Sequence, residues 1–159
     1  PGQDTPVLQF EYLRSRADAD LVHPLGVHDH RIFCAEQYQR LGDKREHMSN
    51  PYRTLLDEGI KVAFGSDGMP FNPIYGVWSA VNHPMRESRI SLVEAIKCYT
   101  LNSAYAGFHE EHVGSVEVGK LADLAVFDRD LTETPEEEIK DAQCYMTLVN
   151  GKILYHMEQ

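Results

Sequence analysis

The sequence predicts an α/β protein, and two observations carry that prediction. In residues 49–64 a short helical pattern is followed at once by a glycine turn and a brief apolar run, the order of a parallel α/β unit. Beyond Gly114 the sequence changes to short apolar runs between glycines, which is typical of β-strands. The chain has 159 residues, of which 42% are hydrophobic, enough for one domain of ordinary size with a packed core.

The helix of the first unit is indicated by the stretch SNPYRTLLDEG. Ser49 or Asn50 can cap its start, Pro51 fits the first helical position, and Gly59 can end it. The next run, IKVAF at residues 60–64, is rich in β-branched and aromatic residues and is bounded by glycines. It predicts a strand that is buried on both faces.

A second helical region is indicated by ISLVEAIKCYTLNSAYAGF. Ser91 with Glu94 three residues later forms a capping box, and apolar residues then recur at helical spacing. The polar residues at 100–102 predict a break. A further short helix is expected near 103–108.

The last third of the chain is predicted to be mainly β. LADLAVFD at residues 121–128 has the pattern of a strand. TPEEE at 134–138 predicts a short helix with threonine as its cap, proline at its first position and a solvated acidic face. Asn150 and Gly151 supply the two positive-φ positions of a type I′ turn, so residues 145–155 are expected to form a hairpin.

Composition and charge exclude several classes of protein. The chain carries 15 basic and 25 acidic residues, and its net charge of −10 would repel nucleic acid and anionic membrane surfaces. No apolar run approaches the roughly 18 residues of a membrane span, and no signal peptide is visible, so we expect a cytoplasmic protein. Cys34, Cys98 and Cys144 form no CxxC pair. They favour reduced, mostly buried thiols over disulfides or a thiolate zinc site.

Four stretches carry a resemblance to a known family. FGSDGMPFNPIYGVWSAVNHP, SLVEAIKCYTLNSAYAGF, GSVEVGKLADLAVFDRD and MTLVNGKILY, in this order, resemble the C-terminal part of the amidohydrolase superfamily, in the branch called amidohydrolase family 3. The resemblance covers roughly Tyr38 to Tyr155. It implies that residues 1–112 are the C-terminal part of a TIM-barrel metallo-dependent hydrolase, and that residues 113–159 supply strands of the accessory β-sandwich.

The same resemblance implies a role for Asp67, which follows the predicted strand 60–64 in the motif GSD. In that superfamily a barrel holds one or two divalent metal ions at its C-terminal face, and the aspartate after the last strand is metal ligand and general base. Catalytic groups on barrels lie where strands end, and Gly65 and Gly68 give the backbone freedom there. The glycine and prolines after Asp67 are expected to break regular structure. The implied cofactor is zinc or iron, and the implied reaction is hydrolysis of a C–N bond in a small molecule.

Four further residues are site candidates. His28 and His30 have the HxH spacing that places two imidazoles on one face of a strand, as metal ligands require; the alternative is two histidines of a loop. His83 and Phe71 are candidate substrate contacts. The alternatives are a structural histidine at a helix end for His83 and core packing for Phe71.

The position of Asp67 in the chain raises a second possibility. Only 66 residues precede it, room for about two α/β units, and the chain starts at Pro1, so we expect most of a closed barrel to be missing. The chain is then either a metal-dependent hydrolase or a truncated, inactive module. In both cases we expect a homo-oligomer or a partner chain that completes the barrel, because open sheets expose strand edges.

Overall fold

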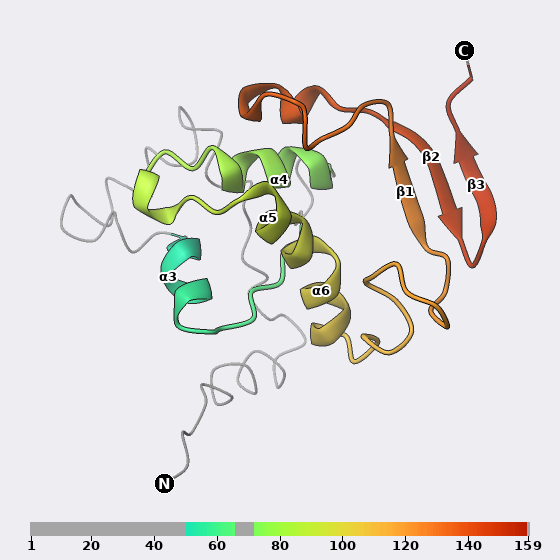
Figure 1. Ribbon diagram of the computed structural model, residues 1–159, viewed down its shortest axis with the longest axis horizontal. Helices are drawn as coiled ribbons and strands as arrows, with labels where there is room; N and C mark the ends of the chain where they lie inside the picture. Colours follow the sequence, from blue (N-terminus) through green and yellow to red (C-terminus); the bar gives the residue numbers. More distant parts are fainter. Residues whose placement is uncertain (1–49, 66–71, 159) are drawn as a thin grey trace, which may run out of the picture.

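The computed structural model of the chain describes residues 50–65 and 72–158 (Figure 1). In this part of the chain the helices form one group, and a three-stranded sheet lies to one side of them. In chain order the elements are α3 (Tyr52–Asp57), α4 (Pro73–Val81), the 3-10 helix η3 (Arg86–Ser88), α5 (Leu92–Tyr99), α6 (Leu101–Ala106), β1 (Leu124–Phe127), the 3-10 helix η4 (Glu136–Asp141), β2 (Cys144–Val149) and β3 (Lys152–His156).

Helix α3 lies where the sequence predicted it, although its cap differs. Asn50 has a left-handed backbone with φ of 51°, and Pro51 becomes the cap residue without a side-chain hydrogen bond. Gly59 ends the helix with φ of 74°, a conformation that glycine adopts without strain. Tyr52 is 0% exposed, so the first turn of α3 points into the core.

The segment 60–64 is extended, but the predicted burial on both faces is wrong. Val62 and Phe64 are buried, whereas Lys61 is exposed and Ala63 is half-buried. Within the described residues this segment forms a β-bridge only at Phe64 and joins no strand ladder. Among the described elements, helices pack against its buried side chains.

Helix α5 begins with the predicted capping box. The Ser91 hydroxyl accepts a hydrogen bond from the Glu94 N–H at 3.3 Å, and the Glu94 carboxylate accepts one from the Ser91 N–H at 2.8 Å. Thr100 separates α5 from α6, so the predicted break is confirmed. Helix α6 starts at Leu101, two residues before the expected position.

Helix α4 was not predicted by the sequence. Pro73 was expected to break regular structure, but it occupies the first turn, where its missing N–H removes no helical hydrogen bond. Asn72 caps the helix from the residue before. An Asn-Pro pair followed by an apolar run was the signal that could have revealed this helix.

The sheet is antiparallel in the order β1-β2-β3. In the turn between β2 and β3, Asn150 and Gly151 have φ of 49° and 73°, so the predicted turn with two positive-φ residues is confirmed. The Asp123 carboxylate accepts a hydrogen bond from the Asn150 N–H at 2.7 Å and ties this turn to the start of β1. The Asp128 carboxylate accepts one from the Gln143 N–H at 2.9 Å and ties the other end of β1 to β2.

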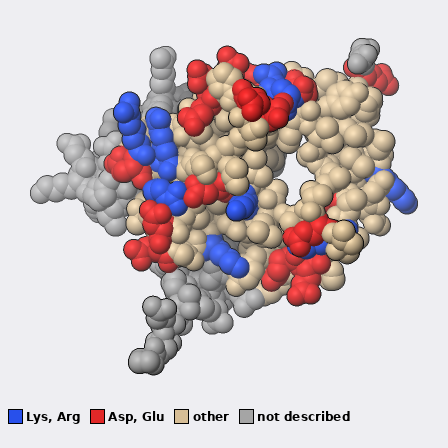
Figure 2. Space-filling view, in the orientation of Figure 1, with Lys and Arg blue, Asp and Glu red and all other residues tan. Residues whose placement is uncertain are grey.

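The third predicted helix is the 3-10 helix η4. Its cap residue is Pro135 instead of Thr134, because the Thr134 hydroxyl donates to the Asp130 carbonyl at 2.7 Å. Ile139 is 1% exposed and joins the core. The glutamates at 136–138 are exposed, as predicted, and acidic side chains gather over η4 on the face shown in Figure 2.

The core lies among α3, α4, α5 and η4, and the sheet adds little to it. All residues of β3 are exposed. None of the helices in residues 50–65 and 72–158 has the length and apolar character needed to span a bilayer. The core residues are Tyr52, Val62, Phe64, Ile74, Val77, Ala80, Val81, Ile90, Ala95, Cys98, Leu131, Ile139 and Ala142.

Glu94 also joins α5 to α3. Its carboxylate accepts a hydrogen bond from Arg53 Nη1 at 2.8 Å, in addition to the bonds from Ser91. Partial burial by itself would raise the pKa of Glu94, but the hydrogen bonds from Ser91 and the charge of Arg53 outweigh it and lower the pKa to about 2.

We expect Glu94→Gln to destabilise the protein by about 1 kcal/mol at pH 7, since it removes the charge but keeps a side chain that can complete the capping box. Because the pKa of Glu94 is lower in the folded state than its ordinary 4.5, the carboxylate stabilises the fold above pH 4.5. This contribution is lost as the pH falls towards 2. Urea unfolding of both proteins at several pH values should show the difference narrowing below pH 4.5. Glu137→Gln, on the exposed face of η4, is the control, and a Glu94→Gln effect independent of pH would contradict the prediction.

Candidate functional site

Most of the predicted site residues lie outside the described part of the chain. Asp67, Phe71, His28 and His30 belong to this group, and His83 is described. The structure does describe the residues on either side of 66–71, and these define how the chain approaches and leaves that segment.

The extended segment before residue 66 is tethered by the junction of α5 and α6. The Phe64 N–H donates to the Cys98 carbonyl at 3.0 Å, and the Ser103 hydroxyl donates to the Phe64 carbonyl at 3.3 Å. Two residues earlier, Asn102 Nδ2 donates to the Val62 carbonyl at 2.9 Å. The break at Thr100 leaves the Cys98 carbonyl free to accept from Phe64. The polar side chains of Asn102 and Ser103, just after the break, hold the backbone of the extended segment.

The chain is fixed again at Asn72. Its Oδ1 accepts hydrogen bonds from the Ile74 N–H at 3.1 Å and the Tyr75 N–H at 3.3 Å. A helix leaves the N–H groups of its first turn without partners, and the Asn72 side chain supplies an acceptor for two of them. Asn72 therefore fixes the position at which α4 begins.

A row of aromatic rings packs around Phe64, at the end of the extended segment 60–64. The Phe64 ring contacts Tyr52 at a centroid distance of 5.1 Å and Tyr99 at 5.4 Å, and Tyr52 in turn contacts His83 at 5.5 Å. All three contacts are edge-to-face, the geometry that aromatic quadrupoles favour. The row joins α3, the extended segment, α5 and the residue after α4.

His83 occupies the buried end of this row and is 1% exposed. Its Nδ1 lies 3.1 Å from the Met85 amide nitrogen and 3.2 Å from the Met85 carbonyl oxygen, so the Met85 backbone offers this nitrogen a partner in either tautomer of the ring. The His83 carbonyl accepts a hydrogen bond from Arg89 Nε at 2.6 Å. This position fits the alternative of a structural histidine at a helix end, while contact of His83 with a substrate stays a prediction.

Two residues that the sequence did not single out meet at the start of α4. An ideal Cβ built on Gly76 would lie 1.9 Å from the Tyr99 hydroxyl oxygen. The tyrosine therefore reaches the helix backbone at a position that only glycine permits. A glycine inside an otherwise apolar helical run was the available signal, and it was obscured because the helix itself was not predicted.

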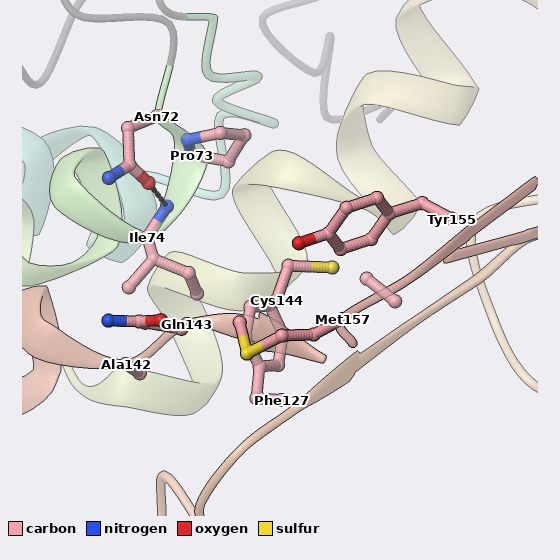
Figure 3. A pocket seen from close by; sticks show the side chains of 10 residues that line it. Asn72, Pro73, Ile74, Phe127, Ala142, Gln143, Cys144, Tyr155 and Met157 are labelled. Atoms are coloured by element: carbon pink, nitrogen blue, oxygen red, sulfur yellow. Dashed lines mark hydrogen bonds between the residues drawn. The ribbon is translucent and has the colours of Figure 1, made fainter. Parts of the chain in front are cut away.

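A hollow of about 480 Å³ lies between the start of α4, the end of η4 and the sheet (Figures 2 and 3). Among the described residues that line it there is no His, Asp or Glu, so this part of the lining suits an apolar group. The lining residues are Asn72, Pro73, Ile74, Ala125, Phe127, Ala142, Gln143, Cys144, Tyr155 and Met157.

The described residues contain no cluster of three or more His, Cys, Asp or Glu that could hold a metal ion. Cys98 is buried, and burial raises the pKa of its thiol to about 11, so it remains a neutral thiol at pH 7. The candidate ligands thus remain Asp67, His28 and His30.

Comparison with known proteins assigns the family. The amidohydrolase family model matches residues 13–155, which is most of the chain. The chain belongs to the amidohydrolase family, as its sequence motifs indicated. The match begins upstream of Tyr38, where the resemblance was expected to begin, so the earlier residues carry family sequence that no short motif revealed.

Individual relatives cover several activities. The N-substituted formamide deformylase of Arthrobacter pascens is 32% identical over 72% of this chain and 23% of its own length. Protein LONG AFTER FAR-RED 3 of Arabidopsis thaliana is 33% identical over 80% of this chain and 24% of its own length. The 5-methylthioadenosine/S-adenosylhomocysteine deaminase of Thermoanaerobacter pseudethanolicus is 29% identical over 65% of this chain and 28% of its own length. The chain thus spans about a quarter of the length of the curated relatives it matches.

Solved structures agree on the fold. An adenosine deaminase from Xanthomonas campestris with bound zinc matches with a TM-score of 0.54 and 19% identity, over 67% of this chain and 28% of that one. An amidohydrolase from Thermotoga maritima matches with a TM-score of 0.50 and 21% identity, over 67% and 26%. Both have the TIM-barrel metallo-dependent hydrolase fold, and this chain corresponds to a part of it.

We expect Asn72→Ala to lower the free energy of unfolding by about 1 kcal/mol, because two N–H groups at the start of α4 lose their acceptor. Asn72→Asp is the matched variant, since it keeps the acceptor and places a negative charge at the positive end of the helix. Urea unfolding should show the loss for alanine and none for aspartate. An equal loss in both would show that the cap does not define this helix.

Proposed function

We propose that this chain contributes to metal-dependent hydrolysis of a C–N bond in a small molecule, with Asp67 as metal ligand and general base. One observation carries the proposal. Residue 67 falls between an extended segment whose carboxyl end is tethered at Phe64 and a helix whose start is fixed by Asn72. In a barrel enzyme, catalytic groups stand at this kind of junction between a strand and the following helix.

The names of the relatives support the reaction class. They include a deformylase of N-substituted formamides, a deaminase of 5-methylthioadenosine and S-adenosylhomocysteine, and imidazolonepropionases. Deformylation of an amide and deamination both break a bond between carbon and nitrogen. We infer a substrate with such a bond for this chain as well, an amide or a cyclic amide.

The proposed chemistry assigns distinct tasks to three side chains. Asp67, His28 and His30 would hold the divalent ion, for which a carboxylate and imidazoles are suitable ligands. When bound, that ion supplies a Lewis acid that makes a water molecule far more acidic than in bulk solvent. Asp67 accepts the proton of the attacking water and passes it to the leaving nitrogen. Zinc is our first candidate, because the Xanthomonas campestris neighbour holds zinc, and iron is the second.

Finer features of the proposal concern the surroundings of Asp67. We propose that Phe71 contacts the substrate and that β1, β2 and β3 belong to the accessory β-sandwich, with the boundary between the two regions at residues 112 and 113. The position of the three-stranded sheet to one side of the helices supports the assignment of its strands (Figure 1), although η4 of the same region packs into the helical core. For His83 we favour the structural role, because the ring is buried between Tyr52 and the Met85 backbone.

Asp67→Asn tests the function directly. We expect the purified wild-type chain to contain one equivalent of zinc or iron and the variant to lose it, because a neutral amide is a much weaker ligand than a carboxylate. Elemental analysis of both proteins after identical dialysis measures this. Asp141→Asn, at an exposed position of η4, should retain the metal. Equal metal content in all three proteins would contradict the assignment of Asp67.

A second candidate function is association with another chain instead of catalysis. The exposed residues of β3 favour it: Ile153, Leu154 and Tyr155 are 60%, 68% and 48% exposed, on consecutive positions of an edge strand. Soluble proteins rarely leave such a strand uncovered, because its backbone and apolar side chains invite pairing.

Sedimentation velocity over a range of concentrations tests this candidate. We expect the chain to associate, and Leu154→Lys to weaken association at least tenfold, because it removes about 1.5–3 kcal/mol of apolar burial per chain. Val118→Lys is the control, since Val118 is fully exposed and lies outside the sheet. A chain that stays monomeric at every concentration would rule the candidate out.

A further inference from the structure

Gly76 has a packing reason to be glycine. It is the fourth residue of α4, its φ is not in the left-handed region, and within helices glycine is about 1 kcal/mol less favourable than alanine. A Cβ at this position would lie 1.9 Å from the Tyr99 hydroxyl oxygen and 2.8 Å from Tyr99 Cζ. The end of the Tyr99 side chain therefore rests directly on the backbone of α4.

The ring of Tyr99 makes a second contact, with the ring of Phe64. It meets the Phe64 ring edge-to-face at a centroid distance of 5.4 Å and an interplanar angle of 71°. Phe64 is also held by its backbone, because its N–H donates to the carbonyl of Cys98, the neighbour of Tyr99 in the last turn of α5. One turn of α5 thus holds the end of the extended segment through both side chain and main chain.

We propose that Tyr99 is a positioning residue that sets the distance between the end of the extended segment at Phe64 and the first turn of α4 at Gly76. These two points flank segment 66–71 on either side in the sequence. The importance of this distance for metal binding rests on the proposed function, because Asp67 lies in that segment. We call the two contacts of Tyr99, with the Phe64 ring and with the backbone at Gly76, the clamp. The clamp does not depend on the proposed function.

A clamp of this kind matters because ligand geometry tolerates little error. A displacement of about 1 Å at a reacting group can cost a factor of about 100 in rate, and metal ligands must meet their ion within a few tenths of an ångström. The Cβ of an alanine at position 76 would require Tyr99 or α4 to move by more than an ångström to reach an ordinary contact distance. Such a shift would be passed to Phe64 and to the first turn of α4, through the contacts of Tyr99 with both.

The test compares Gly76→Ala with Gly107→Ala in the full chain. Gly107 ends α6 with φ of −86°, and the nearest atom to a Cβ there lies 3.4 Å away, so alanine fits at that position without rearrangement. The rescue variant combines Gly76→Ala with Tyr99→Phe, which removes the atom in closest contact. Two quantities are measured at 25 °C on folded protein: hydrogen exchange of the amides at positions 64 and 76, and the affinity for Co²⁺ with its visible absorption.

We expect Gly76→Ala to speed exchange at both positions at least tenfold and to weaken Co²⁺ binding at least tenfold with a changed absorption spectrum. Gly107→Ala should leave both quantities within twofold of the wild type. The rescue variant should recover only part of the lost exchange protection and Co²⁺ affinity, because Tyr99 Cζ would still lie 2.8 Å from the alanine Cβ. A merely structural role would lower the unfolding midpoint but leave the affinity and spectrum of the folded protein unchanged.

Three results decide the outcome. Unchanged exchange at positions 64 and 76, or the same increase throughout the chain, would overturn the clamp. A Co²⁺ affinity within twofold of the wild type in Gly76→Ala would overturn its role in positioning the site. If Asp67→Asn leaves the Co²⁺ affinity of the wild type unchanged, the proposed function fails, and the exchange data alone then support or overturn the clamp.

Discussion

The described structure depends on how the extended segment 60–64 is held. Its backbone has no ladder partner among the described strands, so its polar groups are satisfied by Cys98, Asn102 and Ser103 at the junction of α5 and α6. Buried backbone groups without partners are costly, which makes these bonds obligatory for burial of Val62 and Phe64. The break between two short helices is therefore the feature that lets a strand-like segment enter the core.

Around this segment the helices are joined by contacts of different kinds. Edge-to-face ring contacts connect α3 to α5 through Phe64, and the Arg53–Glu94 ion pair connects the same two helices with an N–O distance of 2.8 Å. The close approach of Tyr99 to Gly76 adds α4. Because rings in a packed interior interlock, these helices and the extended segment form one unit, and the sheet lies outside it.

This arrangement connects the fold to the family's chemistry. The proposed function requires the Asp67 carboxylate at a defined place, and the described chain on both sides of segment 66–71 is anchored by hydrogen bonds, at Phe64 and at Asn72. Buried His83 belongs to the same packed group, because its ring contacts Tyr52, which in turn contacts Phe64.

The sequence by itself determined the features that depend on neighbours in the chain. The capping box of Ser91 and Glu94, the Asn150-Gly151 turn and the stop of α3 at Gly59 each involve residues within a few positions, whose geometry is set by local sterics and hydrogen bonds. The family also followed from short motifs. Only the tertiary structure decided that α4 is a helix despite its glycine, that segment 60–64 is covered on one face, and that His83 is buried. These depend on contacts such as Gly76 with Tyr99, between residues far apart in sequence, which no local pattern encodes.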